Sequence, residues 1–246
     1  LVLSGSNPMR LDMVSMAWDK PRPLPDLKTA SFPTPTYVYN IMNQDHHADP
    51  QADLVIIIPT SQKLLKQAQR LKAFHEQHDS LKVNLVPADE LFNEFSSGTP
   101  DASAYRRYMK MLYDRATGED DRPKYLLLFG DCLWDNRMIT SYNTGKNPDD
   151  YLLAFESENS YDRRVCYIDD GFHAMLDDGE GLRPMYVDKL DIGVGRFPVL
   201  SDAEAKIMVD KTINYAENGN GGAWQNTIMF MGDDGNSNLH MRDCNT

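Results

Sequence analysis

The sequence has few cysteines and no long hydrophobic run. Its three cysteines, Cys132, Cys166 and Cys244, show no CxxC spacing. An odd, scattered set predicts neither a disulfide framework nor a zinc knuckle, and one disulfide with a free thiol stays as open as three free thiols. The longest apolar runs, Leu54–Ile58 and Tyr125–Phe129, are far shorter than the roughly 18 residues that cross a membrane. We therefore expect no membrane-spanning helix in these residues.

Positive charge is also scarce. The 246 residues contain 25 Lys and Arg against 37 Asp and Glu, a formal net charge of −12. Because affinity for nucleic acid depends on neutralising phosphates, we expect no nucleic-acid partner, whereas cationic partners and metal ions stay open. Apolar residues at 41% and aromatic residues at 10% exclude wholesale disorder, and the length suits one large or two small domains with their own core.

Several common catalytic patterns are missing. The sequence contains no GxGxxG or GxxxxGK[ST] phosphate loop and no GxSxG serine-hydrolase turn. A cysteine nucleophile needs a histidine within reach. Cys132 follows a predicted strand, and His173 and His240 are the histidines of the second half. Leu133 and Trp134 directly after Cys132 instead favour a packing role, so the pairing stays open as a weaker alternative.

The pattern of apolar residues predicts an α/β fold. Residues 1–52 are rich in proline and predict an extended lead-in or linker. The pair His46-His47 there could bind a metal, but a solvated loop is the favoured interpretation. From Asp53 on, short buried strands alternate with amphipathic helices, as in a parallel doubly wound sheet. The strands are expected at 54–58, 82–86 and 125–129, and the helices at 61–78, 89–95 and 99–116, the last with Thr99 as its N-cap.

The second half is less regular. Short strands are expected near 151–155 and 165–168, further strands at 190–194 and 227–231, and a helix after Ser201, which forms a capping box with Glu204. We expect the first α/β subdomain at 53–185 and the truncated beginning of a second at 186–246. Ligands in such sheets collect at the carboxyl ends of strands. Acids are expected there at Asp131, in the segment 191–196 and at Asp233-Asp234.

An acidic stretch raises the prospect of a structural calcium ion, because hard cations prefer several carboxylates. Its spacing does not fit an EF-hand loop, and a solvated acidic turn is the alternative. The weak calcium candidates are Asp169, Asp170, Asp177, Asp178 and Glu180.

Several motifs, in register, resemble the gingipain family of cysteine peptidases. They are Phe95–Arg107, Tyr125–Asp131, Asp191–Val199 and Ala203–Lys206, and the segments Tyr151–Asn159 and Gly232–Met241 resemble the sortases of this family. The resemblance implies a caspase-like α/β fold of two side-by-side subdomains. It also implies a cysteine thiolate, a histidine in a His-Gly motif and a supporting acid, with no cofactor required.

Among these groups, only the supporting acid has a counterpart in this chain. By resemblance Asp191 takes its place, since a carboxylate can orient an imidazole; an ordinary ion pair of Asp191 with Arg196 or Lys189 is the alternative. No His-Gly dipeptide occurs, and neither Cys132 nor Cys244 matches the position of the nucleophile. We therefore expect an incomplete catalytic domain that is inactive by itself.

The sortase resemblance implies a role at the bacterial surface. Such enzymes of the type IX secretion system of Bacteroidetes remove C-terminal signal domains from secreted cargo. The expected partners are therefore these cargo domains and secretion-system components. The alternatives are a non-catalytic homologue that binds cargo or acts as a scaffold, and a stand-alone acidic α/β binding protein.

Overall fold

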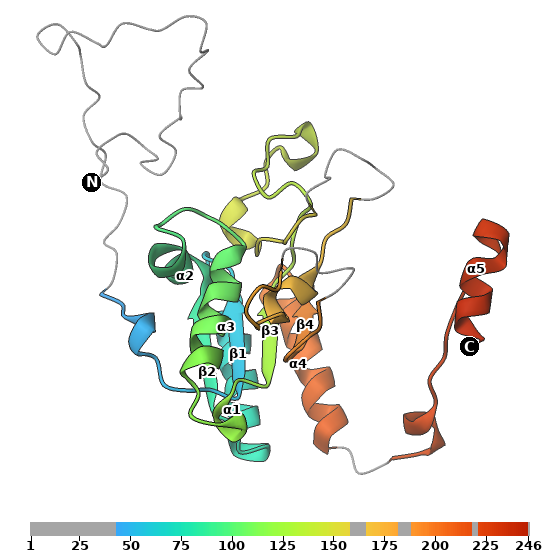
Figure 1. The fold of residues 1–246 in the computed structure, drawn as a ribbon, viewed down its shortest axis with the longest axis horizontal. Helices are drawn as coiled ribbons and strands as arrows, with labels where there is room; N and C mark the ends of the chain where they lie inside the picture. The colour runs from blue at the N-terminus through green and yellow to red at the C-terminus, as the bar shows by residue number, and fades with distance from the viewer. Residues whose placement is uncertain (1–42, 158–165, 182–187, 218–220, 246) are drawn as a thin grey trace, which may run out of the picture. The chain divides into compact units, whose positions relative to one another are not determined.

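Four parallel strands form one sheet in the order β2-β1-β3-β4 (Figure 1). The computed structural model describes residues 43–157, 166–181, 188–217 and 221–245. Leu54 of β1 is in register with Val83 of β2 and with Tyr125 of β3, and Tyr125 is in register with Gly193 of β4. The strands are β1 (Leu54–Ile58), β2 (Val83–Pro87), β3 (Tyr125–Phe129) and β4 (Gly193–Phe197).

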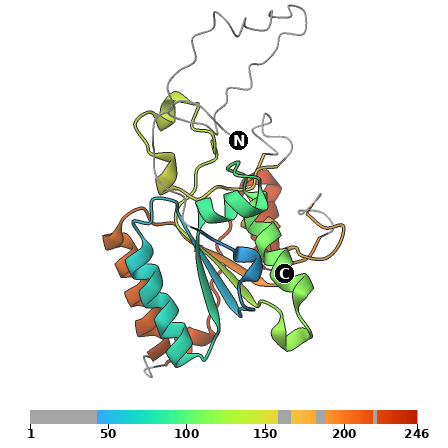
Figure 2. The same cartoon turned by 90° about the vertical axis from the view of Figure 1, so that its left-hand side faces the viewer.

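Helices cover both faces of this sheet. Val55 and Ile57 point into a core that includes Leu91 of α2 and Leu112 of α3. Figure 2 shows α1 and the beginning of α4 on the opposite face, where Gln67 Nε2 donates to Asp202 Oδ1 at 3.0 Å. The doubly wound α/β class is therefore confirmed. The helices are α1 (Leu65–His78), α2 (Ala88–Phe95), α3 (Ser103–Arg115) and α4 (Asp202–Glu217).

The beginnings of two helices test the capping predictions. The helix α3 begins at Ser103 rather than beside Thr99. Asp101 accepts hydrogen bonds from the backbone N–H and the hydroxyl of Ser103, at 2.9 and 2.6 Å, and so fixes the first turn. The capping box of α4 is confirmed, because Ser201 Oγ accepts from the N–H of Glu204 at 3.3 Å and Glu204 accepts from the N–H of Ser201 at 3.1 Å.

The stretch between β3 and β4 contains turns and isolated bridges. Cys132 bridges Leu152, and Glu156 bridges Ile168, where short strands were predicted. Residue 165 lies outside the described residues. In the described residues the short 3-10 helices are η2 (His46–Ala48), η3 (Glu119–Asp121), η4 (Ser141–Asn143), η5 (Pro148–Asp150), η6 (Asp170–Ala174) and η7 (Ala223–Asn226).

The chain divides into two compact units between Val209 and Asp210. The second unit contains η7 and α5 (Gly235–Cys244). The strand predicted at 227–231 is wrong: these residues are extended without a strand, and Ile228 and Phe230 are 79% and 68% exposed. A strand needs a neighbour for its N–H and C=O groups, and this segment pairs with none of the described residues.

The predicted domain boundaries stay predictions. Of the lead-in at 1–52, residues 1–42 lie outside the described part of the chain, and so does the junction at 185/186. The strand β4, which follows that junction, pairs with β3 in the same sheet as β1. None of the helices in the described residues combines the length and the apolar composition that a membrane span requires.

Candidate functional site

A buried guanidinium joins three segments at the carboxyl ends of β3 and β4. Arg196, whose side chain is 9% exposed, forms a two-point ion pair with Asp170 of η6, at 2.8 Å from Nε to Oδ2 and 2.7 Å from Nη2 to Oδ1. Its Nη1 donates to the carbonyl of Gly130 at 3.0 Å. Such fork-to-fork pairs are strong and directional. This arginine therefore has a structural role, and Asp170 is engaged by it.

The surroundings of Cys132 do not activate its thiol. Burial raises the pKa of Cys132, and although Arg196 opposes this shift, Asp170 and Asp131 add to it. A reactive cysteine requires the opposite, a lowered pKa that populates the thiolate. Of the other thiols, Cys166 is exposed and Cys244 is partly buried.

His173 lies in the core and is not poised to act as a base. It is fully buried, and its ring contacts Tyr105 and Phe172, with centroids 5.5 and 5.4 Å away. Neither ring nitrogen has a hydrogen-bond partner among the described residues. Burial lowers the pKa of His173 to about 4, so the ring is neutral at pH 7. No local pattern in the sequence indicated that this histidine is buried.

Asp191 lies two residues before β4, at the amino end of that strand. The sequence predicted that the acid of this segment lies at the carboxyl end of a strand. The prediction is wrong for Asp191, because the strand that pairs with β3 begins only at Gly193. Its Oδ2 accepts from the backbone N–H groups of Leu176 and Asp177, at 2.5 and 3.2 Å. Arg196 pairs with Asp170 instead, so the alternative ion pair of Asp191 with Arg196 is wrong. The role of Asp191 as a supporting acid stays a prediction.

An open groove of about 720 Å³ runs past Asp191 at the amino ends of β3 and β4. Arg122 lies over the ring of Tyr113, 4.4 Å from its centroid, on one side of the groove. Lys124 is paired with Asp53 at 2.8 Å. Carboxylate, cationic and aromatic groups thus share one accessible surface next to Asp191.

Only two of the five calcium candidates come together. Asp177 and Glu180 offer oxygen atoms that lie with one of Asp191 within 4.8 Å of one another. The others have partners elsewhere: Asp169 accepts from the N–H of Gly171 at 2.7 Å, Asp170 pairs with Arg196, and Asp178 pairs with Lys110 at 2.9 Å. Calcium binding stays a prediction.

The His46-His47 pair is not a solvated loop, which corrects the favoured interpretation. The ring of His46 lies between Asp49 and Glu90, 2.8 Å from an oxygen of each. Burial lowers the pKa of His46, but these hydrogen bonds outweigh burial and raise it overall. These contacts therefore hold η2 against α2, although His46 and Glu90 lie 44 residues apart in the sequence.

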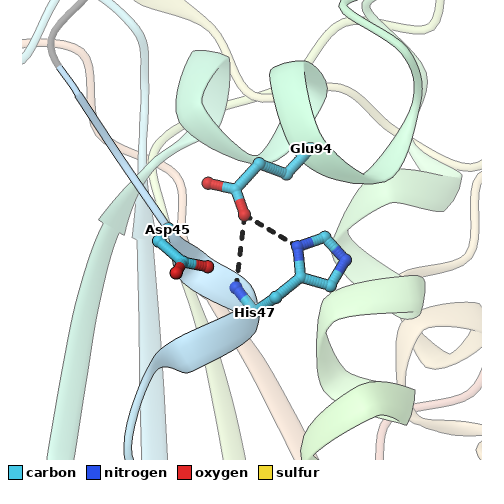
Figure 3. Close-up of side chains that lie close together, drawn as sticks. All are labelled: Asp45, His47 and Glu94. Carbon is cyan, nitrogen blue, oxygen red and sulfur yellow. Dashed lines mark hydrogen bonds and ion pairs between the residues drawn. The ribbon is translucent and has the colours of Figure 1, made fainter.

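The neighbouring residue His47 belongs to a second cluster, drawn in Figure 3. His47 Nδ1 lies 2.8 Å from Glu94 Oε2, and ligand atoms of Asp45, His47 and Glu94 all lie within 4.8 Å of one another. Sequence reasoning missed this group, because 47 residues separate His47 from Glu94 and no local spacing connects them.

Comparisons with known proteins agree with this architecture. The model of peptidase family C25 matches residues 47–246. The crystal structure of dimeric latent PorU from Porphyromonas gingivalis is similar, with a TM-score of 0.66 and 35% sequence identity over 81% of this chain and 19% of the PorU chain. This chain thus spans about a fifth of that protein. A search of curated proteins gave no significant match. Because the family match covers most of the chain, as the motifs predicted, the chain belongs to peptidase family C25, the gingipain family of cysteine peptidases.

Proposed function

We propose that this chain is part of a type IX secretion sortase, a cysteine endopeptidase that removes C-terminal signal domains from secreted cargo at the cell surface. The observation that carries the proposal is the 35% identity with PorU over 81% of this chain. The proposed partners are the cargo domains and other secretion-system components. Nucleic acid is not among them, since the chain carries a net charge of −12.

Within this enzyme, Asp191 would position the catalytic histidine. Two backbone N–H groups hold its Oδ2, while Oδ1 makes no hydrogen bond to a described residue and is available to an imidazole N–H. The open groove beside it leaves room for such a ring. A carboxylate held in this way favours one tautomer of the imidazole and stabilises its protonated form during catalysis.

The nucleophile and the histidine would come from outside these 246 residues. The sequence has no His-Gly dipeptide. The raised pKa of Cys132 and the burial of His173 speak against a substitute dyad made from these two residues. We propose that the chain alone does not cleave peptides.

The test compares this chain with the longest protein that its reading frame encodes, using a cargo protein with its C-terminal signal domain as substrate. We expect cleavage by the longer protein and none by the chain. Asp191→Asn in the longer protein should lower kcat by about 10²–10⁴-fold and shift the histidine limb of the pH profile. Asp178→Asn, a matched change at a carboxylate that is 97% exposed, should leave both unchanged.

Three results would contradict the proposal. The first is cleavage by the chain alone. The second is alkylation of Cys132 much faster than of a free thiol. The third is binding of the cargo domain without cleavage by the longer protein, which would favour the alternative, a non-catalytic cargo-binding or scaffold module.

A further inference from the structure

We infer that Asp45, His47 and Glu94 form a binding site for a divalent transition-metal ion of the zinc class, which joins the segment around η2 to α2. Glu94 reaches down from the last turn of α2, and Asp45 and His47 face it from the other side (Figure 3). The inference concerns residues 45–94 only and is independent of the proposed function, because it involves neither Asp191 nor the groove.

The distances between the ligand atoms suit a zinc ion. The three atoms lie within 4.8 Å of one another, and His47 Nδ1 is 2.8 Å from Glu94 Oε2. Zinc binds nitrogen and oxygen at about 2.0–2.2 Å in a tetrahedron, which separates its ligands by about 3.3 Å. Small side-chain rotations therefore suffice to admit an ion, which would take the place of the hydrogen bond between His47 Nδ1 and Glu94 Oε2.

Two of the three ligands are already held in place. Glu94 Oε1 accepts from the N–H of His46 at 2.9 Å and from Gln44 Nε2 at 2.7 Å, while its Oε2 accepts from the N–H of His47 at 3.2 Å. The ring of His47 stacks on Phe95, with centroids 4.5 Å apart and an interplanar angle of 16°. Partners of this kind orient metal ligands, and less conformational entropy is then lost on binding.

The donor set selects the class of metal. One imidazole with two carboxylates is a ligand set found for zinc, whereas calcium and magnesium prefer oxygen atoms alone. Three protein ligands leave a fourth position for water. Asp45 and His47 are exposed, so an ion can enter from solvent. Asp49 and Glu90, which flank His46 next to the cluster, add further negative charge that a dication would offset.

The probe is zinc chloride, titrated by calorimetry into the 246-residue chain. We expect one zinc ion per chain and a melting temperature that rises with zinc concentration. His47→Ala and Asp45→Asn should each weaken zinc binding by at least about 10-fold, the loss typical of a disturbed metal site. The matched control is His78→Ala. His78, the last residue of α1, has its Nδ1 2.7 Å from Asp79, the residue that follows the helix, and neither residue belongs to a three-ligand group in the described residues. The zinc affinity of this variant should stay unchanged.

The two variants also distinguish the loss of a metal ligand from unfolding of the segment. Asp45 is exposed, so Asp45→Asn keeps the test decisive even if His47→Ala unfolds the segment; circular dichroism of each variant checks this. Three results would overturn the inference: absence of saturable zinc binding, zinc binding that survives both substitutions, and calcium binding as tight as zinc binding.

Discussion

Two five-residue segments with apolar runs, Leu54–Ile58 and residues 227–231, have opposite environments in this chain. The run Leu54–Ile58 is the strand β1, every residue of which is buried. The run at 227–231 forms no strand, and its apolar side chains from Ile228 to Met231 are 68–85% exposed. Both segments were predicted to be strands, and the first was predicted to be buried on both faces. The difference teaches that an apolar run becomes a strand only where the chain also supplies neighbours.

The neighbours of β1 can be named. β2 pairs with it on one side and β3 on the other, so its backbone groups are satisfied in both directions. Core residues of α2 and α3 cover Val55 and Ile57. Residues 227–231 pair with nothing in the described part of their own unit, 210–217 and 221–245.

The sharpest way to break this comparison is to truncate one isoleucine in each run. Ile57→Ala should lower the free energy of unfolding by about 4 kcal/mol, because it leaves a cavity in a core where Ile57 is 0% exposed. Ile228→Ala should change it by less than about 0.5 kcal/mol, since Ile228 is 79% exposed. Urea denaturation measures both; equal losses would mean that the second run is buried in solution.

A second prediction extends the comparison to charged groups. Arg196→Met should lower the free energy of unfolding by about 3 kcal/mol, because it leaves Asp170 and the carbonyl of Gly130 without their buried partner. Arg122→Met is the control at the surface: it removes an ion pair to Glu119, which is 83% exposed, and the contact with the ring of Tyr113, and should lower the free energy of unfolding by about 1 kcal/mol or less. A cost for Arg196→Met no larger than that of the control would show that the buried pair adds nothing.

The third prediction concerns pH and buried His173. Its pKa is about 4 in the folded chain and 6.5 as a reference value, so the unfolded chain binds more protons between these values. The stability that His173 contributes as a neutral group is therefore present above about pH 6.5 and is lost as the pH falls toward 4. The loss should be about 2 kcal/mol between pH 7 and pH 5.

The contribution of His173 to the pH dependence of stability can be separated from that of the other titrating groups. Denaturation of wild type and of His173→Leu across pH 7 to 5 gives the difference directly, and the variant should lose the contribution of His173. If the free energy of unfolding depended on pH equally in the two proteins, the low pKa of this histidine would be contradicted.

The smallest predicted effect is steric. A Cβ added at Gly130, at the end of β3, would lie 2.8 Å from Cγ of Pro59 and 3.3 Å from Cγ of Leu152. Gly130→Ala should therefore cost about 1–2 kcal/mol through overpacking. Gly195→Ala in β4 is the control, since a Cβ there meets no atom within 4 Å. Thermal unfolding compares the two, and an equally stable Gly130 variant would mean that Pro59 moves aside without penalty.

The sequence was sufficient for the fold class because local signals agree with the tertiary structure. Uninterrupted apolar runs marked β1 and β3, and Ser201 with Glu204 marked the beginning of α4. Several motifs in register, among them the segment 191–199, led to the correct family. Each of these signals is contained in a few consecutive residues, and the tertiary contacts in the structure agree with it.

The contacts between distant segments could not be predicted. Asp170 was considered for calcium, but its partner Arg196 lies 26 residues away. His47 and Glu94 meet across 47 residues, and a solvated loop was the simpler expectation for the histidine pair. Such contacts depend on how strands and helices assemble in three dimensions, which one sequence without relatives does not reveal.

The contacts of Arg196 have a consequence for how this part of the chain can change over evolutionary time. The guanidinium binds both Gly130 and Asp170, which lie 40 residues apart in the sequence. Because this contact fixes both positions, an exposed turn between them, such as the one around Gly145, can lengthen at little thermodynamic penalty: doubling a flexible loop adds only about 0.6 kcal/mol of closure entropy. Insertions at that turn are therefore changes that this sheet should tolerate well, whereas exchanges that remove Leu152 or Ala154, which are both buried, should not be tolerated.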